Sequence, residues 1–152
     1  MVNVDCRANV ESHEIYMRLA LRESRKALPE CLPNPPVGCV LARRGVVVSR
    51  GYTKAPGGYH AEADALAGYE GPSSDLTAYV TLEPCSFHGR TPSCADALID
   101  QGVSLVVVAL VDPDPRNDGR GLTKLRRAGV DVIEGVCARE VSEFLTAYLS
   151  DH

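Results

Sequence analysis

Hydrophobic and polar positions repeat with two different periods along the chain, and the change of period predicts its elements. The stretch 13–28 has helical spacing, with Ser12 as a candidate N-cap and Pro29 as the stop. Further prolines up to position 36 predict a stiff loop. The β-rich runs 37–43 and 46–52 flank Arg44 and Gly45, and this arrangement predicts a hairpin.

Beyond the hairpin, helical and strand patterns alternate. Helical patterns occupy 60–69, 92–101, 122–129 and 138–149, and strand patterns occupy 77–82, 103–111 and 130–136. Thr91 and Pro92 look like the N-cap and first residue of the second of these helices. Strands that alternate with helices favour parallel pairing, with helices on both faces of the sheet. The sequence therefore predicts one α/β domain, residues 1–152, with a mixed, mostly parallel five-stranded sheet.

Composition places the chain among ordinary globular proteins. Of its 152 residues, 45% are hydrophobic and 24% charged, and the formal net charge is -4. This balance argues against a non-specific polyanion binder, so we expect no nucleic-acid partner. No apolar run has the length of a membrane span, and the first dozen residues lack the apolar segment of a signal peptide. We expect a cytoplasmic protein without membrane contact.

Cysteine usage raises the question of chemistry. In a chain of this size without a signal peptide, cysteines are more often free, metal-bound or catalytic than disulfide-bonded. Cys39 falls in a predicted strand and is expected in the core. Three others are expected to be ordinary free cysteines: Cys6, Cys31 and Cys137.

Three short segments stand out as a possible metal centre: His60-Ala61-Glu62, Pro84-Cys85, and Cys94. One imidazole and two thiolates suit a catalytic zinc site, in which three protein ligands leave a position for water. Glu62 lies two residues from His60, close enough to act as a base without being a ligand. Deaminases of nucleobases combine such an H-x-E pair, a P-C element and a further cysteine. Each segment alone has a plainer interpretation, a packed or surface residue, and only the joint order favours zinc.

Eight residues separate the two cysteines, and this spacing points to a particular family. The stretch TLEPCSFHGRTPSCADALI, with NPPVGCV upstream and DPDPRNDGRG downstream, resembles the deaminase domain of the riboflavin pathway from about Glu14 to about Phe144. That family deaminates a diaminopyrimidinone ribosylamine 5'-phosphate. The resemblance implies the three-layer α/β/α cytidine-deaminase-like fold and one zinc ion. It also implies functional residues: His60, Cys85 and Cys94 as ligands, Glu62 as proton shuttle, and Asn34 and the Asp112 loop against the substrate.

The chain departs from the family's usual pattern around the expected substrate. Phe87 and His88 exchange the usual order of histidine and aromatic residue, Arg90 replaces a lysine, Asp114 replaces an asparagine, and Thr53 replaces a histidine. A carboxylate at 114 would repel a substrate phosphate. We therefore predict retained deaminase chemistry on a small aminopyrimidine-type substrate, with the altered positions favouring a substrate of secondary metabolism. The family's deaminase is commonly fused to a reductase, whereas this chain is expected to be a stand-alone deaminase.

Several candidate positions keep two interpretations. Arg90 is either a clamp for a phosphate or carboxylate or a solvated loop residue, and His88 either donates to the substrate or lies on the surface. Asn34 and Asp112 are either substrate contacts or turn residues. The glycines of Gly119-Arg120-Gly121 are expected to shape a helix entry rather than a phosphate loop, and His13 is expected on the surface.

Alternative functions also remain open at this stage. The chain could deaminate a nucleoside, a purine base or a base within a nucleic acid, although a strand-binding enzyme needs a basic or aromatic surface. It could also be a zinc-stabilised, non-catalytic relative, although structural zinc sites usually have four protein ligands. No organic cofactor is expected, and a homodimer is expected by analogy with the fold.

Overall fold

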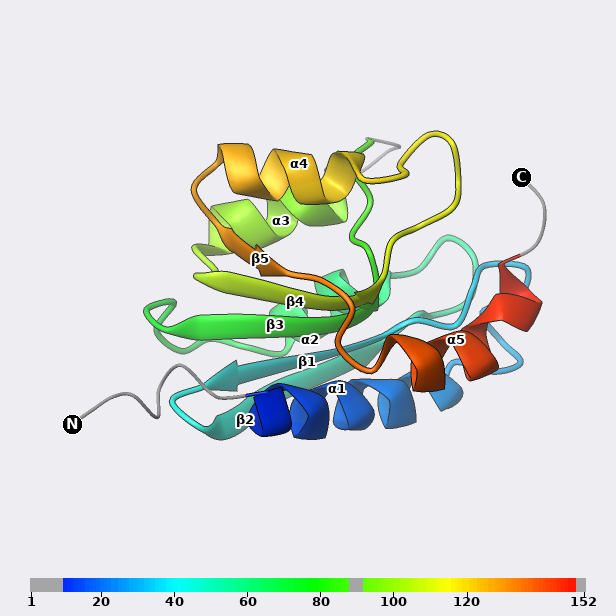
Figure 1. The fold of residues 1–152 in the computed structure, drawn as a ribbon, viewed down its shortest axis with the longest axis horizontal. Helices are drawn as coiled ribbons and strands as arrows, with labels where there is room; N and C mark the ends of the chain where they lie inside the picture. Colours follow the sequence, from blue (N-terminus) through cyan, green and yellow to red (C-terminus); the bar gives the residue numbers. More distant parts are fainter. Residues whose placement is uncertain (1–9, 88–91, 150–152) are drawn as a thin grey trace.

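A central sheet with helices on both sides makes up the computed structural model, which describes residues 10–87 and 92–149 (Figure 1). The elements follow the expected order: α1 (Val10–Arg25), β1 (Gly38–Arg43), β2 (Val46–Tyr52), α2 (Ala61–Ala67), β3 (Leu76–Leu82), α3 (Cys94–Gln101), β4 (Leu105–Leu110), α4 (Arg120–Arg127), β5 (Asp131–Ile133) and α5 (Ala138–Leu145), followed by a 3-10 turn (Thr146–Tyr148).

The sheet has the strand order β2-β1-β3-β4-β5. Strand β1 is antiparallel to both of its neighbours, whereas β3, β4 and β5 pair in parallel. Four of the five strands therefore run in one direction, which confirms the mixed, mostly parallel sheet. The β1–β2 hairpin turns at Arg44 and Gly45, whose φ angles of 52° and 81° are both positive, as tight two-residue hairpin turns require.

Helices cover both faces of the sheet (Figure 1), and an apolar layer packs between the sheet and the helices on each face. One layer packs α2, α3 and α4 through small and branched residues such as Ala65, Leu98 and Leu125. The other packs α1 and α5 through residues such as Met17 and Val141. Strand β4 is buried on both faces over its central residues, as its continuous apolar run predicts. Together these layers confirm the α/β/α architecture.

Three local predictions differ from the structure. Helix α1 begins at Val10, so Ser12 lies within the helix and is not its N-cap. Helix α3 begins at Cys94 and is capped by Ser93 rather than by Thr91, which lies outside the described residues. His13 is buried rather than on the surface: its Nδ1 lies 2.8 Å from the Tyr79 hydroxyl, 66 residues away in sequence.

The free cysteines agree with expectation where the structure describes them. Cys39 is fully buried in the core, and Cys31 and Cys137 carry no disulfide. Cys6 lies outside the described residues. Within residues 10–87 and 92–149, no helix has both the length and the apolar character needed to cross a membrane.

Candidate metal centre and cavity

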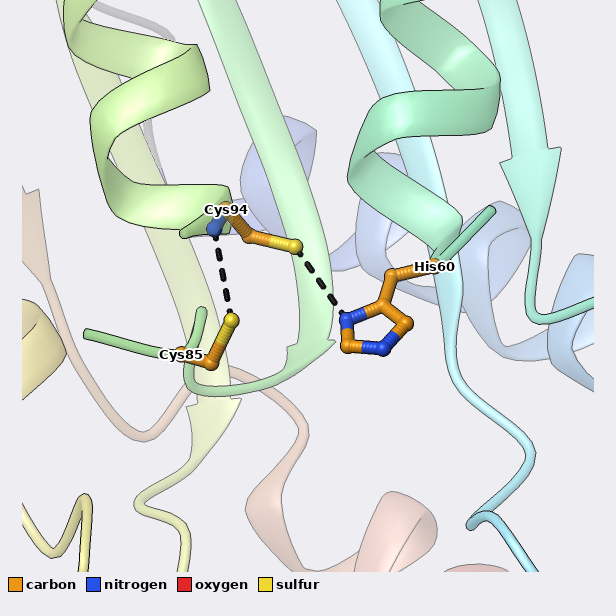
Figure 2. Close-up of side chains that lie close together, drawn as sticks. All are labelled: His60, Cys85 and Cys94. Carbon is orange, nitrogen blue, oxygen red and sulfur yellow. Dashed lines mark hydrogen bonds between the residues drawn. The ribbon is translucent and has the colours of Figure 1, made fainter. Parts of the chain in front are cut away.

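Two helix N-termini and one strand end bring the three candidate ligands together. His60 is the N-cap residue of α2, Cys94 is the first residue of α3, and Cys85 follows the end of β3 by three residues. Figure 2 shows the His60 ring and the two sulfur atoms turned toward a common point. The positive ends of two helices face this point, and they stabilise thiolates over thiols.

The position of His60 depends on a close helix–sheet contact. Gly51 in β2 lies against α2, where a Cβ atom would come within 2.4 Å of the Ala61 carbonyl oxygen and the Ala65 nitrogen. Only glycine permits this approach. The His60 backbone is extended, and its side chain makes no capping hydrogen bond, so the imidazole is available as a ligand.

The start of α3 is fixed by its cap and by α4. Ser93 is buried, and its Oγ accepts a hydrogen bond from the Asp96 backbone N–H at 3.1 Å. Lys124 of α4 donates to the Asp96 carboxylate at 2.8 Å and to the Ser86 carbonyl at 3.3 Å. Cys94 is therefore held between the helix cap and the loop that carries Cys85.

The geometry of the three residues fits a single metal ion. Their ligand atoms all lie within 4.8 Å of one another. The Cys94 Sγ is 3.4 Å from the His60 Nδ1, and the Cys94 backbone N–H donates to the Cys85 Sγ at 3.3 Å (Figure 2). A tetrahedral site with nitrogen and sulfur ligands is typical of zinc.

The electrostatics of the two thiols also fit a cation. Hydrogen bonds from Cys94 and His60 lower the pKa of Cys85, so this thiol ionises first. The hydrogen bond to Cys85 and burial raise the pKa of Cys94. Hydrogen bonding to Cys85 raises the pKa of His60. A divalent cation at this point would hold both sulfurs as thiolates and the imidazole as a neutral ligand.

Glu62 is a buried carboxylate beside this group. Its side chain belongs to the first turn of α2 and is only 4% exposed. Burial and the charge of Cys85 raise the pKa of Glu62 to about 7. A carboxyl group with a pKa near the working pH can both accept and release a proton, as a general acid/base must.

A cavity of about 290 Å³ opens over the candidate metal ligands. Its size is near the lower end of small-molecule sites. The cavity is lined by most of the residues expected at a substrate, together with some that were not: Pro33, Asn34, Pro35, Val37, Thr53, His60, Glu62, Leu82, Glu83, Cys85, Phe87, Asp112, Asp114 and Arg116. Asn34, Asp112 and Asp114 are thus brought to the same space as Glu62. His88 and Arg90 lie outside the described residues.

Asp114 does not present a bare carboxylate to this cavity. The Arg116 guanidinium binds it through two donors, Nη2 at 2.6 Å and Nε at 3.1 Å to different oxygens. The same guanidinium lies 4.7 Å from the centre of the Phe87 ring. The repulsion of a phosphate that the sequence predicts at Asp114 is therefore offset by a cation two residues further along.

Sequence analysis did not single out Arg116 or Glu83. The sequence does carry a signal for Arg116, because a cation two residues after an aspartate in a turn can form an ion pair with that aspartate. Glu83 lies in the quoted TLEPC stretch, directly before the metal-ligand segment, and is only 3% exposed. Its partners are backbone groups distant in sequence, which no residue pattern reveals.

Comparison with known proteins agrees with this geometry. Residues 10–110 match the family model described as the cytidine and deoxycytidylate deaminase zinc-binding region. The chain is 45% identical over 136 residues to riboflavin biosynthesis protein RibD of Escherichia coli, covering 90% of this chain and 37% of that protein. It is 37% identical over 129 residues to a diaminohydroxyphosphoribosylamino-pyrimidine deaminase of Buchnera aphidicola, covering 85% of this chain and 88% of that protein.

Solved structures give the same relationship. Acinetobacter baumannii RibD superposes with a TM-score of 0.88 at 36% identity, over 93% of this chain and 40% of that one. The Rib2 deaminase of Aspergillus oryzae in complex with DARIPP superposes with a TM-score of 0.72 at 25% identity, over 90% and 91% of the two chains. The chain thus spans well under half the length of its RibD relatives. It belongs to the cytidine and deoxycytidylate deaminase zinc-binding family, and its relatives include RibD proteins and diaminohydroxyphosphoribosylamino-pyrimidine deaminases.

Proposed function

We propose that this hydrolytic deaminase acts on a diaminopyrimidine that carries a ribosylamine phosphate. The observation that carries the proposal is the position of Glu62, buried beside three metal-ligating side chains at a cavity of small-molecule size. The Buchnera aphidicola relative is named for this substrate, and it matches the chain over most of its own length.

The protein's own groups account for binding and proton transfer. His60, Cys85 and Cys94 would hold zinc, which supplies the acidification of the attacking water. Glu62 takes a proton from that water on a carboxylate oxygen and passes it to the ring nitrogen. The water oxygen bonds to the amine-bearing carbon. Glu62 then takes the remaining proton of that oxygen and gives it to the amine, so that the C–N bond breaks, ammonia leaves and a C=O bond remains. The burial that raises the pKa of Glu62 to about 7 lets it carry the proton in both transfers.

The far end of the substrate is assigned to the mouth of the cavity. Asn34 is expected against the ring, as the family resemblance implies, and Asp112 lines the same cavity. Arg116 still has donors free of Asp114, since a guanidinium carries five N–H groups. These donors are suited to a ribose phosphate, and Asp114 holds the guanidinium in place for it.

The test is ammonia release by the zinc-loaded protein with the riboflavin intermediate, its dephosphorylated form, cytidine, cytosine and guanine. We expect turnover of the phosphorylated intermediate. Glu62→Gln should lower kcat by about 10²–10⁴-fold while zinc content stays unchanged, because a neutral amide cannot accept the proton. Asp64→Asn is a matched control on the same helix, since Asp64 pairs with Lys54 and does not line the cavity.

Each other outcome has a defined meaning. Turnover of a different panel member, and not of the intermediate, would favour the redirected substrate predicted from Phe87, Asp114 and Thr53. Unchanged turnover in Glu62→Gln would contradict its role as proton carrier. A zinc-loaded wild type that releases no ammonia from any member would contradict the proposed substrate.

Two further expectations belong to this proposal. A homodimer is expected because enzymes of this fold usually associate, and light scattering after size-exclusion chromatography tests it directly. A cytoplasmic location is expected for an enzyme of vitamin biosynthesis, and fractionation of cells that express the protein tests it.

A further inference from the structure

Glu83 is a buried carboxylate that neither metal binding nor proton transfer explains. Glu83 follows the last residue of β3, two residues before Cys85. Its backbone N–H donates to the Leu110 carbonyl at 2.9 Å, so it continues the β3–β4 pairing beyond the strand. Its side chain therefore lies at the carboxyl ends of two parallel strands, where the cavity opens.

Three backbone N–H groups converge on this carboxylate. One Glu83 oxygen accepts from Asp112 at 3.1 Å and from Gly119 at 2.9 Å, and the other accepts from Leu122 at 3.0 Å. The three donors come from the start of the loop after β4, its end, and the first turn of α4. One side chain thus closes the whole 112–119 loop and satisfies a helix N-terminus.

Asn117 makes a second connection between the same segments. It is completely buried, and its Nδ2 donates to the Pro84 carbonyl at 3.2 Å and to the Asp112 carboxylate at 3.4 Å. Its Oδ1 accepts from the Gly121 N–H at 3.1 Å. A Cβ at Gly121 would lie 1.9 Å from the Pro84 carbonyl oxygen, so the two backbones are in direct contact.

The two ends of this network carry different parts of the site. Glu83 and Pro84 lead directly into Cys85, a metal ligand, whereas the clamped loop carries Asp112, Asp114 and Arg116, which line the cavity. Displacement of the loop would move the substrate-facing groups relative to the reacting carbon. Misplacement by about 1 Å can lower a rate by about 10²-fold.

We propose that Glu83 and Asn117 are positioning residues that fix the substrate-facing 112–119 loop to the metal-ligand segment. The proposal rests on the proposed function, since it assumes that Asp112, Asp114 and Arg116 meet the substrate. Glu83 acts through the backbone of the loop and takes no part in proton transfer.

The experiment compares Glu83→Gln and Asn117→Ala with the wild type, all zinc-loaded. In Glu83→Gln, an amide NH2 replaces one acceptor oxygen and opposes a backbone donor. We expect KM to rise about tenfold or more, with kcat falling less than KM rises and with zinc content unchanged. Amide hydrogen exchange should accelerate at Asp112, Gly119 and Leu122.

A matched control separates positioning from stability. Glu23 is also a buried carboxylate, 3% exposed, but it lies in α1 and pairs with Lys26 and Arg50. Glu23→Gln should lower stability and leave KM unchanged. If Glu83→Gln behaves in the same way, with wild-type KM in its folded fraction, the positioning role is contradicted.

Failure of the proposed substrate gives a different result. In that case the wild type itself does not release ammonia from the riboflavin intermediate, and KM is measured with whichever panel member it does deaminate. Exchange at the three loop amides needs no substrate. Wild-type exchange rates at these amides in folded Glu83→Gln and Asn117→Ala would therefore overturn the inference whatever the substrate is.

Discussion

The candidate metal-ligand group and the loop proposed to meet the substrate are built in different ways. His60 and Cys94 lie at the first positions of helices, and Cys85 follows a central strand. The loop carries Asp114 and Arg116, which line the cavity. The family's usual residues are intact in the first region, whereas the described departures, Thr53, Phe87 and Asp114, line the cavity around it. Ligands on helices and strands tolerate little change, whereas loop side chains can vary without loss of the fold.

The largest effect is expected when one of the candidate metal ligands is removed. Cys94→Ala should abolish zinc binding and turnover, because the two remaining ligands are too few for a catalytic site. Metal analysis and ammonia release measure the two losses. Cys39→Ala is the matched control: Cys39 is fully buried in the core and not a ligand, so its loss should cost about 1 kcal/mol of stability and leave zinc in place. Unchanged zinc content in Cys94→Ala would contradict the assignment of Cys94 as a metal ligand.

An intermediate effect is expected in the loop. Arg116→Ala should lower kcat/KM for a phosphorylated substrate about tenfold or more, because it removes the guanidinium that binds the Asp114 carboxylate and would donate to the phosphate. The dephosphorylated substrate should be affected much less. Adding Asp114→Asn to Arg116→Ala should recover part of the loss, since the repelling charge is then gone. Equal losses for both substrates would contradict a phosphate role for Arg116.

The smallest effect concerns the opposite face of the sheet, away from both regions. Burial lowers the pKa of His13, so the folded protein binds this proton less well than the unfolded chain. The free energy of unfolding should therefore be highest above pH of about 6.5, the ordinary pKa of histidine, and fall as the pH drops toward the lowered folded value. Urea unfolding at pH 8 and pH 5 measures this decrease.

His13→Gln should reduce that decrease, because glutamine does not titrate. Its side chain can still form a hydrogen bond with the Tyr79 hydroxyl. An equal loss of stability at low pH in both proteins would assign the effect to other groups.

Sequence patterns predicted the fold because its elements are locally encoded. The Arg44-Gly45 turn, the apolar β4 run and the alternation of helix and strand each rest on adjacent residues. The candidate metal ligands could be found for a similar reason, since each lies within a short motif at an element boundary, and the fold brings the three together. The α3 cap had a signal that went unused: Ser93 and Asp96 form the S-x-x-D pattern of a helix start.

Two of the three missed features depend on contacts between segments that are distant in sequence. His13 is buried beside the hydroxyl of a tyrosine 66 residues away, and the helical period of the sequence does not reveal this contact. The residue type at position 114 predicts a bare negative charge, whereas in the fold the Arg116 guanidinium binds the Asp114 carboxylate. Glu83 joins three amides between 29 and 39 residues away. The partners of Glu83 become its neighbours only because the parallel strands β3 and β4 end side by side.

The hydrogen bonds of Glu83 have a consequence for how this enzyme can change over evolutionary time. The carboxylate binds main-chain groups, which are the same whatever side chains the loop carries. Residues 113–116 can therefore be exchanged without loosening the attachment of the loop. New substrates could be explored by substitution at these positions alone, while the groups that perform the reaction stay in place.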